Sequence, residues 1–167
     1  LSNLAAGVML IIFKPIKVGD YINGGGAEGA VESVGIFVTT LVTLDNKVIY
    51  VPNATLTSGN IVNVTAKDTR RVDMVFGISY SDDIDKARSA INEVVNANSK
   101  ILKEPKPDIL VSELGDSSVN FNVRPWVKTG DYWAVRADLM ERIKLSFDEN
   151  GISIPYPQQD VHMHNAA

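Results

Sequence analysis

The chain opens with thirteen uncharged, mostly apolar residues, and Lys14 and Pro15 follow them at once. This run predicts a helix that ends at Lys14, because proline disfavours helical geometry in the residue before it. Thirteen helical residues rise about 20 Å, whereas crossing a bilayer takes about 20 residues and 30 Å. Lys14 and Lys17 stand where the positive-inside rule expects cytoplasmic flanking charge. Residues 1–15 therefore predict the end of a membrane or interfacial helix, with a buried helix of a soluble protein as the alternative.

Between residues 16 and 68, short segments rich in β-branched residues alternate with turn residues. Strands are predicted at residues 20–22, 29–34, 37–44, 47–51 and 61–64. Five strands in so short a stretch indicate a small Sm-like β-barrel or a tightly curled sheet. Asp45 and Asn46 both tolerate positive φ, which predicts a two-residue hairpin loop of type I′.

A glycine-rich run in this region, residues 24–29, matches the G-x-G-x-x-G pattern of dinucleotide-binding folds. That chemistry needs the glycines to follow a strand and to open a helix, whose N-terminus then meets the pyrophosphate. Because a β-branched segment follows here instead, the run predicts a turn.

From residue 69 onward the period changes to strands separated by helices. A strand over 72–80 precedes a helix, for which Ser81 is the expected cap. Strands follow at 109–114 and 119–126, and Asp131 opens a second helix that ends at Asn150 and Gly151. The apolar stripes of the two helices are Ile84, Ala87, Ile91 and Val95, and Val135, Leu139, Ile143 and Phe147.

This order of elements, β-α-β-β-α, is typical of a split βαβ, ferredoxin-like layer. A last strand is expected near Val161. The fold class is therefore α+β, with an apolar membrane-interface helix at residues 1–15, a β domain at 16–68, a ferredoxin-like α/β domain at 69–157 and a C-terminal strand at 158–167. Arg70 and Arg71 are expected in the linker between the two domains, touching a neighbouring subunit or lipid headgroups.

Composition and charge narrow the possible chemistry. The chain has no cysteine, which excludes thiol catalysis, disulfides and zinc sites built on thiolates. Residues 1–71 carry six Lys/Arg against five Asp/Glu, and residues 72–167 carry ten against fifteen. A near-neutral half and an acidic half argue against a nucleic-acid partner.

No catalytic constellation is visible, and we expect no enzyme. Asp82, Asp83 and Asp85 point in different directions on a helix and suit its N-terminus better than acid–base work. Ser117 and Ser118 have no histidine near them in sequence.

A metal site is not expected either. Asp160, His162 and His164 share one face of an extended segment, but the chain has only these two histidines and both are close to its end. Only a symmetric oligomer, such as a ring of seven chains, would bring more than two histidines together.

Six segments, taken in order, carry a resemblance to a known family. They are FKPIKVGDYI at 13–22, GAEGAV at 26–31, VPN at 51–53, NIVN at 60–63, YSD at 80–82 and GISIPYP at 151–157. Each is common alone, but their order and spacing are similar to the MscS family of small-conductance mechanosensitive channels. The opening residues 1–7 also resemble the second half of that family's pore-lining helix.

The resemblance implies a homoheptamer in a bacterial-type inner membrane, with most of this chain on the cytoplasmic side. Its partners would be the lipid bilayer, permeating ions and small solutes, with no cofactor and no nucleic acid. Membrane tension opens such a pore and releases solutes under hypo-osmotic shock. The transmembrane helices that precede the pore helix in the family are expected upstream of Leu1.

The resemblance also suggests roles for particular residues. Asn3 and Gly7 are candidate hinges of the gating helix, and Lys14 and Lys17 flank the membrane. Val161, His162 and Met163 would form a strand that closes the oligomer. For Gly7 two readings stay open: bending is cheap at glycine, by about 1 kcal/mol relative to alanine, or small residues simply fit a crowded surface.

Two other functional classes remain as alternatives. One is a soluble oligomeric scaffold or binding module that reuses the same body. The other is an RNA-binding protein, which rests on fold analogy alone, since the sheet strand with Phe121 lacks surrounding basic residues.

Overall fold

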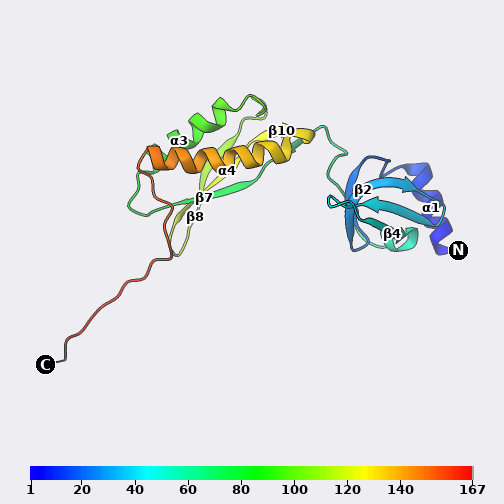
Figure 1. Ribbon diagram of the computed structural model, residues 1–167, viewed down its shortest axis with the longest axis horizontal. Coiled ribbons are helices and arrows are strands. Elements are labelled where there is room, and N and C mark those ends of the chain that lie inside the picture. Colours follow the sequence, from blue (N-terminus) through cyan, green and yellow to red (C-terminus); the bar gives the residue numbers. More distant parts are fainter. Residues whose placement is uncertain (167) are drawn as a thin grey trace. The chain divides into compact units, whose positions relative to one another are not determined.

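The computed structural model describes residues 1–166, and the chain divides into two compact units (Figure 1). Unit 1 is Leu1–Asp68, and unit 2 begins at Thr69. Both combine helices with antiparallel sheets, so the fold is α+β, as the sequence predicts.

Unit 1 is a curled five-stranded antiparallel sheet in the order β4-β3-β2-β1-β5. The five predicted strands are confirmed, with ends that shift by at most two residues. The short helix α2, which was not predicted, connects the edge strands β4 and β5. The elements are α1 Ser2–Phe13, β1 Tyr21–Gly24, β2 Ala27–Val34, β3 Val38–Val42, β4 Val48–Pro52, α2 Asn53–Leu56 and β5 Val62–Asn63. Their core consists of Leu10, Ile16, Ile22, Val31, Leu41, Val51 and Leu56.

The two hairpins of unit 1 differ from each other. Gly25 and Gly26 form the β1–β2 loop with φ of 60° and 76°, a type I′ turn, which confirms that the glycine run is a turn. The type I′ prediction for Asp45 and Asn46 is wrong, since only Asn46 has positive φ and the loop holds three residues. The Thr43 hydroxyl causes this, because it donates to Asp45 Oδ1 at 2.6 Å and accepts the Lys47 N–H at 2.8 Å.

Unit 2 has a three-stranded sheet in the order β7-β9-β8, in which β9 lies antiparallel to both neighbours. With α3 and α4 this makes the ferredoxin-like β-α-β-β-α layer predicted from the sequence. The elements are β6 Thr69–Arg71, β7 Met74–Ile78, α3 Ile84–Ala97, β8 Asp108–Leu114, β9 Val119–Arg124, β10 Trp126–Lys128, the 3-10 turn η1 Thr129–Asp131 and α4 Tyr132–Glu149.

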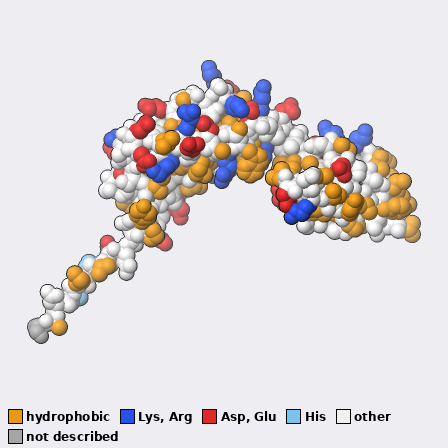
Figure 2. Space-filling view, in the orientation of Figure 1, with side chains coloured by type: hydrophobic (Ala, Val, Ile, Leu, Met, Phe, Trp, Pro, Cys, Tyr) orange, Lys and Arg blue, Asp and Glu red, His pale blue; other side chains and the backbone are white. Residues whose placement is uncertain are grey.

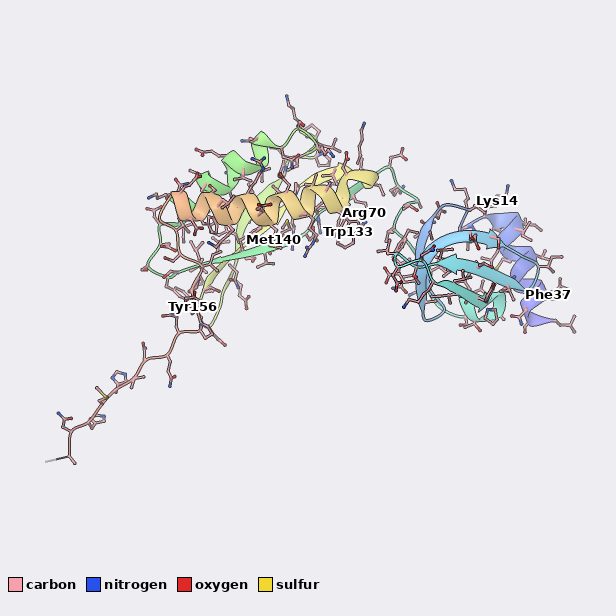
Figure 3. The ribbon with its side chains drawn as sticks, in the orientation of Figure 1. Lys14, Phe37, Arg70, Trp133, Met140 and Tyr156 are labelled. Carbon is pink, nitrogen blue, oxygen red and sulfur yellow. The ribbon has the colours of Figure 1, made fainter. Side chains whose placement is uncertain are left out.

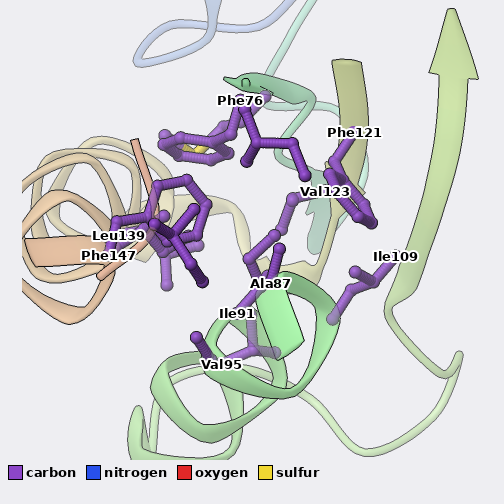
Figure 4. Packing of buried hydrophobic residues seen from close by; sticks show 14 of the residues in the cluster. Phe76, Ala87, Ile91, Val95, Ile109, Phe121, Val123, Leu139 and Phe147 are labelled. Atoms are coloured by element: carbon purple, nitrogen blue, oxygen red, sulfur yellow. The ribbon is translucent and has the colours of Figure 1, made fainter. Parts of the chain in front are cut away.

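Both helices of unit 2 pack on one face of this sheet (Figure 4). Phe76 and Phe121 project from the strands toward Ile91 of α3 and Phe147 of α4, and the Phe76 and Phe147 rings meet edge to face with centroids 6.5 Å apart. The predicted stripe of α4 is fully buried, and the stripe of α3 is buried except at Ile84, where more than a third of the residue is exposed.

Three local predictions for unit 2 need correction. Arg70 and Arg71 lie in β6, which pairs with β10, so they are not linker residues. The Arg70 guanidinium stacks 3.8 Å from the centre of the Tyr132 ring, and Arg71 pairs with Asp73. The cap of α3 is Asp83, which accepts the Lys86 N–H, and not Ser81.

The expected strand near Val161 is not formed either. Residues 152–166 contain neither helix nor strand, and the last residue of the predicted 158–167 segment lies outside the described part. An extended segment needs a partner strand, and the part of the chain that the structure describes offers none to these residues.

Candidate functional site

Helix α1 has two different apolar faces. Ala6, Gly7 and Leu10 are buried against the rest of unit 1. Leu4, Val8, Met9, Ile11, Ile12 and Phe13 are exposed. Hydrophobic side chains accordingly gather over the α1 end of unit 1 (Figure 2). Only one face of α1 is therefore used for folding of the single chain.

Gly7 packs closely against the β2–β3 turn and the side chain of Asn53. A Cβ atom added to it would stand 2.0 Å from the Ile36 carbonyl oxygen and 2.6 Å from Asn53 Nδ2. Real Cβ contacts are never this short, so the backbones of α1 and the β2–β3 turn approach closely only because residue 7 is glycine. This contact supports the packing explanation for Gly7. A hinge at the same position stays a prediction.

Asn3 fastens the first turn of α1 to α2. Its Oδ1 accepts the Ala54 N–H at 2.9 Å, across 51 residues of sequence. Helix α2 follows Pro52 and has no side-chain cap of its own, so Asn3 satisfies one of the free amides at its start. Both hinge candidates thus hold α1 to the same side of unit 1.

Asn53 connects these contacts, and the sequence did not single it out as functional. Its side chain is fully buried. Oδ1 accepts the Thr39 hydroxyl at 2.8 Å, and Nδ2 donates to the Gly35 carbonyl at 2.9 Å. Its backbone N–H donates to the Phe37 carbonyl at 2.9 Å. The Val-Pro-Asn motif at residues 51–53 was the sequence signal for it.

Helix α1 ends as predicted at Lys14, which adopts left-handed backbone geometry with φ 48° and donates its N–H to Leu10. Lys14 and Lys17 are both exposed, and Lys14 stands at the end of α1 (Figure 3). An exposed apolar helix face thus ends beside exposed cationic side chains.

The loop after α1 is held by the nearly buried carboxylate of Asp20. Oδ2 accepts the Lys17 N–H and Asn63 Nδ2, both at 2.9 Å, and the Thr65 hydroxyl approaches Oδ1 at 3.4 Å. Burial works to raise the pKa of Asp20, but the hydrogen bonds from Asn63, Lys17 and Thr65 and the charge of Lys17 outweigh it and lower this pKa. Asp20 therefore ties the end of α1 to β5.

We expect Asp20→Asn to lower the free energy of unfolding of unit 1 by about 1–3 kcal/mol, because one amide cannot accept all three donors. A lowered native pKa means that this stabilisation exists above the unfolded value and is lost as pH falls below about 4. Thermal unfolding of both proteins between pH 7 and pH 3 measures it. The exposed Glu32→Gln is the matched control, and a difference that stays constant down to pH 3 contradicts the prediction.

The C-terminal tail starts from two fixed points on unit 2. Asp82 Oδ2 accepts the N–H groups of Ser79 at 3.0 Å and Ser153 at 2.9 Å. Farther on, the Gln158 N–H donates to the Ser117 hydroxyl at 3.0 Å. Beyond this point Val161, His162 and Met163 are exposed. Their role in closing an oligomer remains a prediction.

We expect Asp82→Ala to release the start of this tail while α3 stays folded, since Asp83 provides the cap. Hydrogen exchange at the Ser153 amide should accelerate about tenfold, the equivalent of one hydrogen bond. Asp85→Asn, which changes only an exposed pair with Arg88, is the control. Unchanged exchange at Ser153 in the Asp82→Ala protein contradicts this role.

Among the described residues, no helix is both long enough and apolar enough to cross a membrane.

Comparison with known proteins identifies the class of protein to which this arrangement belongs. Residues 1–66 match the family model of the mechanosensitive ion channel beta-domain, and residues 72–154 match that of the mechanosensitive ion channel MscS, C-terminal. The chain therefore belongs to the MscS family of mechanosensitive ion channels.

Individual relatives agree. The chain is 46% identical over 166 residues to the small-conductance mechanosensitive channel of Edwardsiella ictaluri, covering 99% of this chain and 58% of that protein. It is 47% identical over 163 residues to an uncharacterized MscS family protein of Synechocystis, covering 98% and 55%. The crystal structure of Helicobacter pylori MscS in a closed state superposes with a TM-score of 0.92 at 37% identity, covering 99% of this chain and 66% of that one. The chain thus spans between half and two thirds of the length of these relatives.

Proposed function

We propose that this chain forms the cytoplasmic-side body and the end of the pore helix of a mechanosensitive channel, which opens under membrane tension and releases solutes in hypo-osmotic shock. The single observation that carries the proposal is the position of α1. One apolar face is locked to unit 1 through Asn3 and Gly7, and the other is exposed beside Lys14. Because α1 is attached to unit 1 and can contact lipid, it would transmit force between the bilayer and unit 1.

The exposed side of α1 has the properties of an interfacial helix. Side chains such as Ile12 and Phe13 are 65% and 78% exposed, although burial in an apolar phase is favourable for both. The two lysines at its end suit the headgroups on the cytoplasmic side of a bacterial-type inner membrane. Met9 and Ile11 are exposed as well, so exposed apolar side chains cover the whole outer side of the helix.

Assembly into a ring, of seven copies by family resemblance, is the second part of the proposal. Unit 2 leaves apolar side chains exposed on the sheet face opposite its helices, among them Val75 on β7 and Leu110 on β8. No strand among the described residues pairs with the tail at Val161 to Met163. Mass measurement of the membrane-extracted protein tests this part, and a monomer at micromolar concentration contradicts it.

The functional test is electrophysiological. The protein that carries this chain is expressed in bacteria without their own mechanosensitive channels, and membrane patches are stretched by suction. We expect current steps that open with tension. Asn3→Ala should change the closing rate under held tension, and the neighbouring exposed Ser2→Ala should not. A protein that reaches the membrane but gives no tension-dependent current contradicts the proposal.

A soluble oligomeric scaffold is the alternative function, and the exposed face of α1 disfavours it. Extraction separates the two, since a scaffold is released from cells without detergent. Asp82 and Asp83 have structural roles, because both accept backbone N–H groups.

A further inference from the structure

The sheet of unit 2 lacks the last element of its fold. A ferredoxin-like layer has the order β-α-β-β-α-β, and here no strand follows α4 among the described residues. The place for it is the outer edge of β7, since β9 occupies the other edge. Apolar residues nevertheless alternate after α4, at Ile152, Ile154 and Tyr156, as they would in a half-buried strand.

The first residue of this missing strand is in place. The Ser79 N–H donates to the Ser153 carbonyl at 3.1 Å, which sets Ser153 opposite Ser79. Ile152 is buried in the core of unit 2, as is Ile78, the neighbour of Ser79. The chain therefore enters the position of a fourth strand in the correct register, with its apolar side toward the helices.

Beyond Ser153 the chain leaves β7. The Gln158 N–H donates to the Ser117 hydroxyl in the β8–β9 hairpin, and the tail departs from unit 2 at this end of the sheet (Figure 1). Ile154 is 48% exposed and Tyr156 is 85% exposed, although the alternation would place both toward the helices. Something other than the apolar pattern thus keeps this segment away from β7.

The register shows what opposes pairing. Antiparallel strands exchange both N–H···O bonds at every second residue pair, so after the pair of residues 79 and 153 the next such pairs are 77 with 155 and 75 with 157. Residues 155 and 157 are both proline, which has no N–H to donate. Proline is accepted in an edge strand where its nitrogen faces solvent, and here both nitrogens would face β7.

We propose that Pro155 and Pro157 prevent the chain from completing its own sheet and so direct the tail to the β8–β9 hairpin. A fourth strand along β7 would carry residue 158 to the Met74 end of the sheet, about 17 Å from Ser153. The prolines exclude this arrangement and leave the edge of β7 open within the chain. The consequence for assembly rests on the proposed function: a tail that does not pair with its own chain stays available to other chains.

Hydrogen exchange of the whole purified protein tests the proposal. In the double variant Pro155→Val, Pro157→Val, the Val75 and Gly77 amides should exchange at least about tenfold more slowly, the equivalent of one hydrogen bond. The Phe76 amide faces β9 and should not change. Tyr156→Val, which keeps both prolines, is the matched control and should exchange as the unaltered protein does.

Unchanged exchange at Val75 and Gly77 in the folded double variant overturns the proposal. If that variant does not fold, Pro155→Val alone decides, because it should still slow exchange at Gly77, and unchanged exchange there is equally contrary. Mass measurement of the same proteins tests assembly separately. An unaltered ring mass in a double variant whose β7 edge is protected contradicts the oligomer-closing strand and leaves the role of the prolines in place.

Discussion

Gly7→Ala should release α1 from unit 1 and lower the thermal midpoint of that unit by about 4–16 °C. The new methyl group would stand 2.0 Å from the Ile36 carbonyl oxygen, a backbone atom that cannot rotate away. Overpacking costs about 1–3 kcal/mol, and a contact this short belongs in the upper half of that range. Alanine returns about 1 kcal/mol of helix propensity, so the expected net loss is about 1–2 kcal/mol. Each kcal/mol shifts the midpoint of so small a unit by about 4–8 °C.

Hydrogen exchange along residues 2–13 distinguishes release of α1 from general unfolding. The amides of α1 should exchange at least about tenfold faster, while those of the β2–β3 ladder change less. Gly59→Ala is the matched control, because Gly59 has open space around it and no positive φ. If Gly7→Ala instead stabilises unit 1, the glycine serves flexibility and the close contact does not constrain it.

Periodic elements with a wide buried face could be predicted from the sequence. The stripe from Val135 to Phe147 repeats every three to four residues and is completely buried on α4. The strands of unit 1 were predictable for the same reason, since alternation and turn residues are local signals.

Features decided by a single hydrogen bond could not be predicted in this way. The Thr43 hydroxyl selects a three-residue loop over the type I′ turn that Asp45 and Asn46 also permit. At the start of α3, Ser81 and Asp83 are both good caps, and Asp83 alone lies where it reaches the Lys86 N–H. Sequence shows which residues are suitable, but the local geometry chooses among them.

Only part of the candidate site could be predicted from the sequence, for a related reason. Asn3 and Gly7 could be named because the residues around them resemble the family's pore-lining helix. Their partners Ala54 and Ile36 are brought to them only by the fold of the sheet. Asn53 was not predicted as a site residue, because its role depends on hydrogen bonds with Thr39 and Gly35, which are distant in sequence.

Asn53→Ala should be the most destabilising polar substitution in unit 1. It would leave the buried Thr39 hydroxyl without its acceptor and the Gly35 carbonyl without its side-chain donor, at about 1–3 kcal/mol for each group. We expect a loss of about 2–5 kcal/mol, measured by urea unfolding of the whole chain with a probe in unit 1. Asn60→Ala, an exposed asparagine of the same unit, is the control and should change stability by less than about 0.5 kcal/mol.

Combining this substitution with Gly7→Ala tests whether the two residues form one contact. Asn53 Nδ2 is the second obstacle to a Cβ at position 7, at 2.6 Å, so its removal should relieve part of the overpacking. The double variant is therefore expected to lose at least about 0.5 kcal/mol less than the sum of the two single losses. Relief should be incomplete, because the Ile36 carbonyl remains in place. Strict additivity would show that Asn53 stabilises the sheet alone and that α1 is held to unit 1 independently of it.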